Sequence, residues 1–162
     1  MCYTEVTIEK VTERINIIVK REIQEKQFHI GEVYLMKFGG RGNEQQGWRP
    51  GIVFQNNVGN AHSPNIIAIP LTSSLKKMGQ PTHVYLPAGE ETGLRKNSIA
   101  LCENPECMSK ECIGSYLTTI PREYMAQIAI GNLLATSAIA YIEPNKLLTV
   151  WQKSLSLNAA IA

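Results

Sequence analysis

The first part of the chain repeats apolar residues at intervals of three and four positions, with charged residues between them. Within residues 4–27 the repeated positions are Ile8, Val11, Ile15, Ile18 and Val19. This spacing gathers apolar side chains on one face of an α-helix, although β-branched residues lower helix propensity. We therefore predict an amphipathic helix over 4–27, for which packing is a simpler role than binding a partner.

Alternation of apolar and polar positions, which indicates β-strands, begins near residue 31. The first predicted strand covers 31–38, and a polar loop follows over 39–49. Residues 57–65, rich in Asn, Gly, Ser and Pro, form a second predicted loop. Short strands separated by loops predict a small curled sheet or barrel rather than βαβ units. The further strands are expected over 51–56, 65–72 (buried on both faces), 82–86 and 98–103.

Helical periodicity returns towards the end of the chain. Residues 121–139 are predicted to be helical, since Pro121 suits a first turn and Glu123 favours a helix start. Residues 144–157 also carry apolar residues at helical spacing, namely Leu147, Leu148, Trp151 and Leu155. A group of strands followed by helices predicts the α+β fold class.

The composition is that of an ordinary soluble domain. The chain has 162 residues, of which 44% are hydrophobic and 19% charged, enough for one substantial core. Its apolar runs are too short to span a bilayer. Glu5, Glu9 and Glu13 interrupt the pattern expected of a signal peptide. We therefore expect a cytoplasmic protein without a membrane partner.

Charge and cysteine spacing carry less information about function. The formal net charge is +2, and residues 31–100 hold seven basic and four acidic residues. This excess is compatible with phosphate binding and equally with a solvated surface. Zinc sites usually contain close pairs such as C-x-x-C, whereas three cysteines here are five positions apart: Cys102, Cys107 and Cys112. Reduced thiols and no metal or other cofactor are therefore expected.

Polar residues concentrate at three places among the predicted strands. In the first, residues 42–50, glycines flank several amides, and the Arg49–Pro50 step favours an extended arginine suited to gripping a phosphate. The other two places follow predicted strands, where loops carry binding and catalytic residues. They contain Thr72 with Lys76 and Lys77, and Glu103 with Asn104.

Each of these candidates also has a structural interpretation. Arg49 can form a surface salt bridge, and Thr72 can cap a turn. Glu103 can stay solvated or pair with Lys110. Structural or surface roles are expected for the three scattered histidines, His29, His62 and His83.

Six short segments, taken together in their order along the chain, form a pattern more specific than any one of them. They are residues 31–34, 43–50, 55–60, 69–73, 81–84 and 93–98. The most specific is the Glu-Gln-x-Gly-x-Arg-Pro element that ends at Pro50. In order and spacing they resemble the MazF/PemK (Kid-like) toxin family of type II toxin–antitoxin systems, whose members are mRNA interferases. The resemblance covers about residues 29–140.

The resemblance implies both a fold and a reaction. The fold is a small curled SH3-like β-barrel (CcdB/PemK-type) with a C-terminal helix, usually in a homodimer that pairs with a cognate antitoxin. The reaction is sequence-selective, metal-independent cleavage of single-stranded RNA (mRNA), in which the 2′-hydroxyl attacks the phosphate and leaves a 2′,3′-cyclic phosphate. This chemistry needs a base, an acid and donors for the developing charge.

Site residues follow from the same resemblance. Arg49 and Thr72 match residues at the scissile phosphate, and Glu103 keeps an acidic position suited to a general base. The expected RNA-binding residues lie in the loop that closes on RNA, after the third strand and beside Glu103. They are Asn43, Glu44, Gln45, Gln46, Lys76, Lys77 and Asn104.

Two positions depart from the family pattern. Leu101 stands where one subgroup has an arginine assigned as an acid, and Glu106 reverses the charge of an arginine close to RNA. The alternative prediction is therefore a catalytically weakened homologue that acts as an RNA- or protein-binding module. Helical extensions are predicted outside the toxin domain at 29–140, namely at 1–28 and 141–162.

Overall fold

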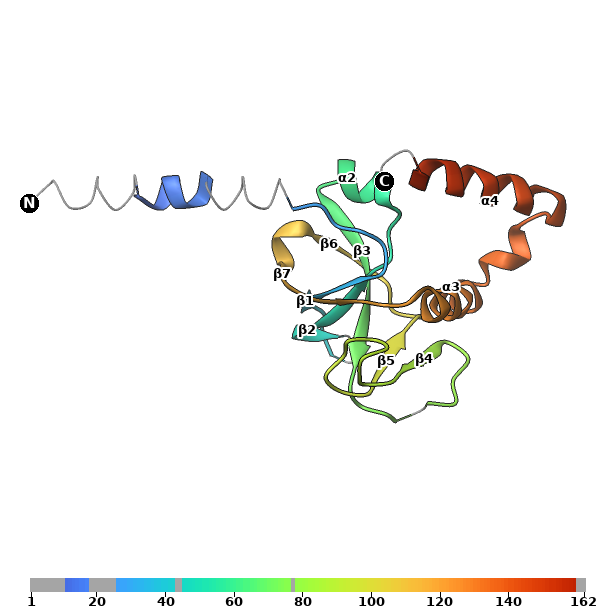
Figure 1. Cartoon of the computed structure of the whole chain (residues 1–162), viewed down its shortest axis with the longest axis horizontal. Coiled ribbons are helices and arrows are strands. Elements are labelled where there is room, and N and C mark those ends of the chain that lie inside the picture. The colour runs from blue at the N-terminus through green and yellow to red at the C-terminus, as the bar shows by residue number, and fades with distance from the viewer. Residues whose placement is uncertain (1–10, 18–25, 43–44, 77, 160–162) are drawn as a thin grey trace, which may run out of the picture.

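The computed structural model describes residues 11–17, 26–42, 45–76 and 78–159, which form an antiparallel sheet with several helices (Figure 1). The strands are β1 (Glu32–Gly39), β2 (Gln46–Val53), β3 (Asn65–Thr72), β4 (His83–Leu86), β5 (Ser98–Leu101), β6 (Glu106–Ser109) and β7 (Ile113–Thr119). The helices are α2 (Asn57–His62), α3 (Arg122–Thr136), α4 (Pro144–Ala159) and the short 3-10 helices η1 (Lys110–Cys112) and η2 (Ala138–Tyr141).

The sheet is curled like a barrel without closing on itself. Its strands follow the order β4-β5-β3-β2-β1-β7, and β6 pairs with β3 outside this path. The predicted α+β fold class with a small curled sheet is therefore confirmed. No helix in the part of the chain that the structure describes is long and apolar enough to cross a membrane.

The β1–β2 hairpin is longer than the sequence predicted. Its ladder runs from Val33 opposite Ile52 to Gly39 opposite Gln46, so residues 46–49 belong to β2 rather than to a loop. Arg49 consequently lies inside a strand, where it pairs with Met36, and not at the start of one. Its position is thus set by pairing along the hairpin.

Strand β3 lies at the centre of the sheet and has two partners along one edge. Leu71 pairs with Ala100 of β5, and Ala68 pairs with Glu106 of β6. Residues 102–105 therefore leave the ladder and form a turn opposite the middle of β3, where Pro70 has no amide hydrogen to donate. The strand predicted over 98–103 ends at Leu101 for this reason.

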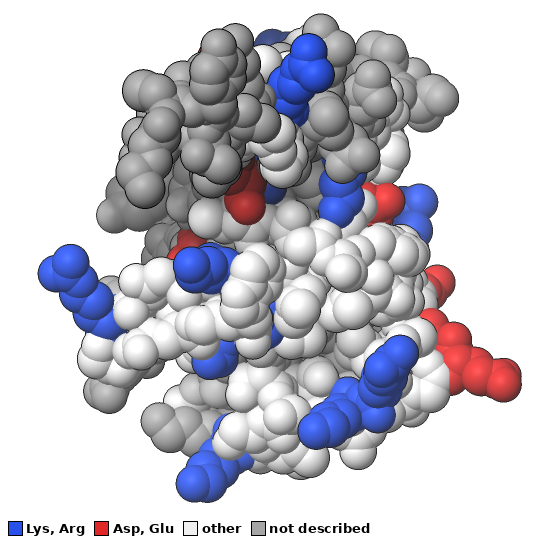
Figure 2. Space-filling view, turned by 90° about the vertical axis from the view of Figure 1, so that its left-hand side faces the viewer, with Lys and Arg blue, Asp and Glu red and all other residues white. Residues whose placement is uncertain are grey.

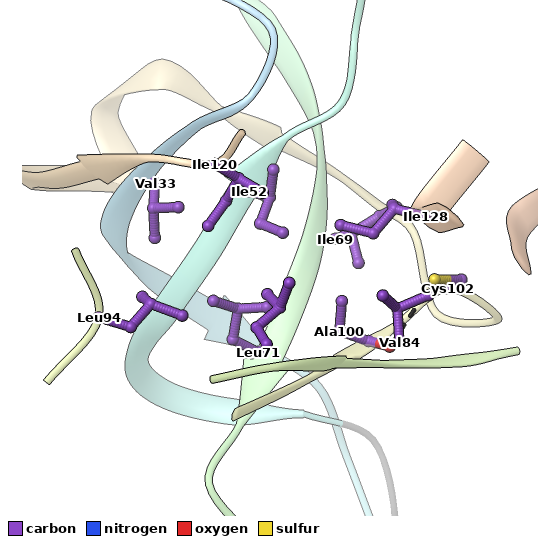
Figure 3. Close-up of a cluster of buried hydrophobic side chains, with 11 residues drawn as sticks. Val33, Ile52, Ile69, Leu71, Val84, Leu94, Ala100, Cys102, Ile120 and Ile128 are labelled. Atoms are coloured by element: carbon purple, nitrogen blue, oxygen red, sulfur yellow. Dashed lines mark hydrogen bonds between the residues drawn. The ribbon is translucent and has the colours of Figure 1, made fainter. Parts of the chain in front are cut away.

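Two hydrophobic clusters lie on the two faces of the sheet. Alternation along β3 sends Ile69 and Leu71 to one cluster and Ile66 and Ala68 to the other. The predicted burial on both faces therefore holds from Ala68 to Leu71, whereas Asn65 and Ile67 are exposed. The first cluster also contains Ile128 of α3 and is shown in Figure 3. The second is built from Phe28, Tyr34, Met36, Phe38, Val53, Ile66, Ala68, Met108 and Ile113.

Helices α3 and α4 confirm the two predicted C-terminal helices, whereas α2 corrects the loop predicted at 57–65. Helix α2 forms because the Asn56 side chain caps it by accepting a 2.9 Å hydrogen bond from the amide of Gly59. Strands β6 and β7 were not predicted. Of the helix predicted at 4–27, residues 11–17 are helical with every side chain exposed, and the described remainder from Lys26 to Gln27 is not helical. Residues 4–10 and 18–25 lie outside the described residues.

Candidate active site

An open groove lies where the β1–β2 turn meets the turn between β5 and β6. Its volume is about 620 Å³, and its lining consists of Gly39, Gly40, Gln45, Glu103, Asn104, Pro105 and Glu106. Three predicted site residues from two distant parts of the chain thus share one cavity: Gln45, and the adjacent Glu103 and Asn104.

Arg49 does not line the groove, but it is hydrogen-bonded to the β1–β2 turn, whose Gln45 does. Its Nη1 donates a hydrogen bond to Oε1 of Gln45, and its Nε and Nη2 donate to the carbonyl oxygen of Gln46 at 3.2 Å and 2.8 Å. The Gln46 side chain in turn donates to the carbonyl oxygen of Gly42 at 3.1 Å. A guanidinium has more N–H donors than these three contacts use, so donors remain for a phosphate.

Arg49 and Thr72 lie on the same face of the sheet. The β2–β3 ladder ends where Gly51 pairs with Pro70, and two residues further along each strand lie Arg49 and Thr72. Because side chains alternate, Arg49 shares the face of Val53, and Thr72 shares the face of Ala68. Val53 and Ala68 belong to the same cluster, so the register directs both predicted phosphate-binding side chains to one face and one end.

Glu103 projects from a short turn that is fixed at several points. The amide of Asn104 donates to the carbonyl oxygen of Leu101 at 3.1 Å, which closes the turn around Glu103. The amide of Cys102 donates to Thr82 at 3.0 Å, and its carbonyl accepts 3.0 Å from Nδ2 of Asn132 on α3. The carboxylate is therefore carried by a backbone held by Thr82, immediately before β4, and by α3.

The carboxylate of Glu103 contacts His83, which the sequence interpretation left as a structural or surface residue. Nε2 of His83 lies 2.9 Å from Oε1 of Glu103, and the two side chains are 7% and 33% exposed. Pairing of Glu103 with Lys110 is not observed, because Lys110 donates to the carbonyl oxygen of Asn60 at 2.6 Å. The signal available in the sequence was that His83 belongs to one of the six ordered segments.

Cys102, beside Glu103, is a buried free thiol rather than a reactive one. Burial, with a smaller effect from the charge of Glu103, raises its pKa to about 12. Its side chain packs against α3 so closely that a Cβ added at Gly131 would lie 3.0 Å from the sulfur. Cys107 is exposed and Cys112 half-buried, and both are free.

Thr72, predicted to contact the scissile phosphate, does not line the groove. Thr72 is half-buried, and its hydroxyl accepts a 3.2 Å hydrogen bond from the amide of Ser74. Lys76 is exposed and does not line the groove, whereas Asn43, Glu44 and Lys77 lie outside the described residues. In Figure 2, Lys and Arg are scattered over the face shown rather than concentrated in one patch.

The two departures from the family pattern have different surroundings. Leu101 is only 6% exposed and belongs to the buried core, so this position offers no proton donor to the groove. Glu106 lines the groove itself, where its negative charge opposes a phosphate.

Residues 29–131 match the model of a family described as PemK-like, MazF-like toxins of type II toxin–antitoxin systems. The chain is 32% identical over 99 residues to the endoribonuclease MazF of Staphylococcus epidermidis, covering 60% of this chain and 82% of that protein. This match spans most of the relative, so the similarity is not confined to one motif.

Solved structures show the same fold. MazF from Deinococcus radiodurans superposes with a TM-score of 0.61 at 23% identity, over 70% of this chain and 99% of that one. A mycobacterial endoribonuclease in complex with its cognate antitoxin superposes with a TM-score of 0.57 at 24% identity, over 68% of this chain and 95% of that one. With the family model covering well over half of its residues, this chain belongs to the PemK-like, MazF-like toxin family of type II toxin–antitoxin systems.

Proposed function

We propose that the protein is a sequence-selective endoribonuclease toxin that cleaves single-stranded RNA without a metal ion. Membership of the family and the endoribonuclease activity of the 32% identical relative support the reaction class. The observation that carries the proposal is the shared groove, in which the Glu103 carboxylate lies beside Gln45, the residue bonded to Arg49. An anionic base and a guanidinium near one cavity suit attack on a phosphodiester.

The proposed reaction uses the substrate's own 2′-hydroxyl as the nucleophile. Glu103 takes the proton of this hydroxyl while its oxygen bonds to phosphorus, and the bond from phosphorus to the 5′-oxygen breaks. Arg49 and Thr72 stabilise the added negative charge by donating hydrogen bonds to the phosphate oxygens. Water in the open groove protonates the leaving oxygen, since Leu101, at the position where one subgroup has an arginine, carries no acidic proton. The products are a 2′,3′-cyclic phosphate and a 5′-hydroxyl.

RNA binding is proposed for the β1–β2 turn and the turn after Glu103. Gln45 and Asn104 line the groove with amide groups that can read base edges, and Gln46 is exposed beside them. Asn43, Glu44, Lys76 and Lys77 are assigned the same role by the family resemblance. Glu106 adds a negative charge to this surface, which lowers affinity for the backbone and alters the choice of cleavage sequence.

Partners and organisation follow from family membership. We assign the toxin domain to residues 29–140 and terminal extensions to 1–28 and 141–162; the family model itself matches residues 29–131. We propose that the protein forms a homodimer, binds a cognate antitoxin and acts in the cytoplasm. The mycobacterial structural neighbour, solved in complex with its cognate antitoxin, supports the proposed antitoxin. Sedimentation of the purified protein tests the dimer.

A catalytically weakened RNA- or protein-binding module is the second candidate. The buried Leu101 and the groove-lining Glu106 favour it, because each replaces a cationic group of the family pattern. Incubation of the purified protein with a long single-stranded RNA of mixed sequence in EDTA separates the two. Cleavage that Arg49→Ala abolishes supports the enzyme, whereas intact RNA with a folded wild-type protein overturns it in favour of the binding module.

A further inference from the structure

We propose that His83 is a positioning residue that holds the carboxylate of Glu103 in the orientation needed for proton transfer. The inference rests on the proposed ribonuclease function and adds a residue to it. His83 does not line the groove, so it acts through Glu103 rather than by touching RNA.

The two residues are anchored to one small piece of backbone. His83 is the first residue of β4 and pairs with Leu101 of β5, whose carbonyl oxygen closes the turn that carries Glu103. The neighbouring Thr82 accepts the amide hydrogen of Cys102 at 3.0 Å. Their separation is therefore set by strand pairing and by a closed turn, both of which are rigid compared with a solvent-exposed glutamate side chain.

The two side chains of the pair differ in their exposure to solvent. The His83 side chain is 7% exposed and its ring is confined by packing, whereas the Glu103 side chain is 33% exposed at the groove. A glutamate that is this exposed has several rotamers, and ordering it costs entropy. The 2.9 Å contact with the confined ring selects one orientation of the carboxylate before RNA arrives.

The chemistry of the contact assigns different roles to the two carboxylate oxygens. An ionised carboxylate only accepts hydrogen bonds, so Nε2 of His83 carries the hydrogen that Oε1 of Glu103 accepts. Within the described residues, Oε2 makes no hydrogen bond, and it remains to accept the proton of the 2′-hydroxyl. Removal of the Nε2 donor frees the carboxylate to rotate, and misplacement of a reacting group by about 1 Å can cost on the order of 100-fold in rate.

Substitutions of His83 that place an amide nitrogen at the position of only one of the two ring nitrogens test whether Nε2 is the donor. The amide nitrogen of glutamine reaches the position of Nε2, and that of asparagine reaches only that of Nδ1. We expect His83→Phe and His83→Asn to lower kcat for RNA cleavage about 10- to 100-fold with KM changed less than about twofold, and His83→Gln to restore most of the rate. His62→Gln, at an exposed histidine of α2, is the matched control and keeps the wild-type rate.

A double-mutant cycle with Glu103→Gln separates positioning from a structural role. If His83 acts through Glu103, adding His83→Phe or His83→Asn to Glu103→Gln lowers kcat no further. Three results would overturn the inference: losses in kcat that multiply in the double variant, a wild-type rate in both single variants, or failure of His83→Gln to restore the rate. In each case cleavage by the wild-type protein would still uphold the proposed function. Absence of cleavage by folded wild-type protein overturns both. If His83→Phe does not fold, His83→Asn completes the cycle.

Discussion

Asn132 on α3 donates a 3.0 Å hydrogen bond from Nδ2 to the carbonyl oxygen of Cys102, the residue that precedes Glu103. This single contact joins the helix to the turn at the groove. With Gly131 packed against the Cys102 side chain, it makes α3 a support for the proposed base and not only a cover for the core.

Replacement of Asn132 by Ala should therefore lower both stability and cleavage. The buried Cys102 carbonyl would lose its side-chain donor, and we expect the free energy of unfolding to fall by about 1–2 kcal/mol. Urea denaturation measures the stability, and cleavage of RNA below its unfolding range measures activity. Asn145→Ala, at an exposed position in the first turn of α4, is the control and should change neither. A stable Asn132→Ala variant would show that the contact contributes little.

Arg49 should be more sensitive to substitution than its partial exposure implies. We expect Arg49→Ala to lower the rate of RNA cleavage about 100- to 1,000-fold, as removal of a transition-state donor does elsewhere. Arg49→Lys should recover only a small part, because an ammonium cannot reproduce the fork of donors that contacts Gln45, Gln46 and a phosphate. Arg122→Ala, at an exposed residue that begins α3, should cleave normally. Equal activity of the Ala and wild-type proteins would remove Arg49 from the reaction.

Gly93 is required by its backbone conformation and by its neighbour. Its φ is +65°, and an added Cβ would lie 2.2 Å from the hydroxyl oxygen of Thr118. That hydroxyl donates to the carbonyl oxygen of Thr92, so it cannot move without losing a hydrogen bond. We expect Gly93→Ala to cost about 2–4 kcal/mol of stability in urea or thermal unfolding. Gly79→Ala, where a Cβ meets nothing within 4 Å, should be near neutral. A loss below about 1 kcal/mol for Gly93→Ala would refute the steric argument.

Cysteine alkylation should separate the exposed Cys107 from the buried Cys102. Because burial raises the Cys102 pKa to about 12, this residue stays a protonated thiol at pH 8.5, and only the thiolate reacts. Brief treatment with iodoacetamide followed by peptide mass mapping should find Cys107 modified and Cys102 unmodified until urea unfolds the chain. Rapid labelling of Cys102 in the folded protein would contradict its burial.

Much of the fold could be predicted because the pattern of burial is local. Strand β3 alternates between two buried faces, and α3 and α4 repeat apolar residues with helical spacing. Helix α2 was missed because Gly and Asn are poor helix formers, and its cap at Asn56 decides the outcome. The start of β2 was misjudged because pairing with β1 extends the strand into a polar, glycine-containing segment.

The sequence allowed only part of the candidate site to be predicted. The family resemblance singled out Gln45 and Glu103, which the structure brings to one groove, and Arg49, which is hydrogen-bonded to Gln45. The contact between His83 and Glu103 spans 20 positions and arises from the pairing of β4 with β5, which no local pattern specifies. The hydrogen bond from Asn132 to the carbonyl oxygen of Cys102 is likewise a tertiary contact that no local pattern specifies.

Chemical analysis of the cleaved RNA tests the central claim most directly. A long RNA first locates a cut, and a short oligonucleotide with that sequence is then compared with one that has a single 2′-deoxy nucleotide immediately 5′ of the cut phosphate. In EDTA, the proposed mechanism predicts 2′,3′-cyclic phosphate and 5′-hydroxyl ends on the all-ribose strand and no cut in the deoxy-substituted one. Cleavage of the deoxy-substituted strand, or 5′-phosphate ends, would contradict it.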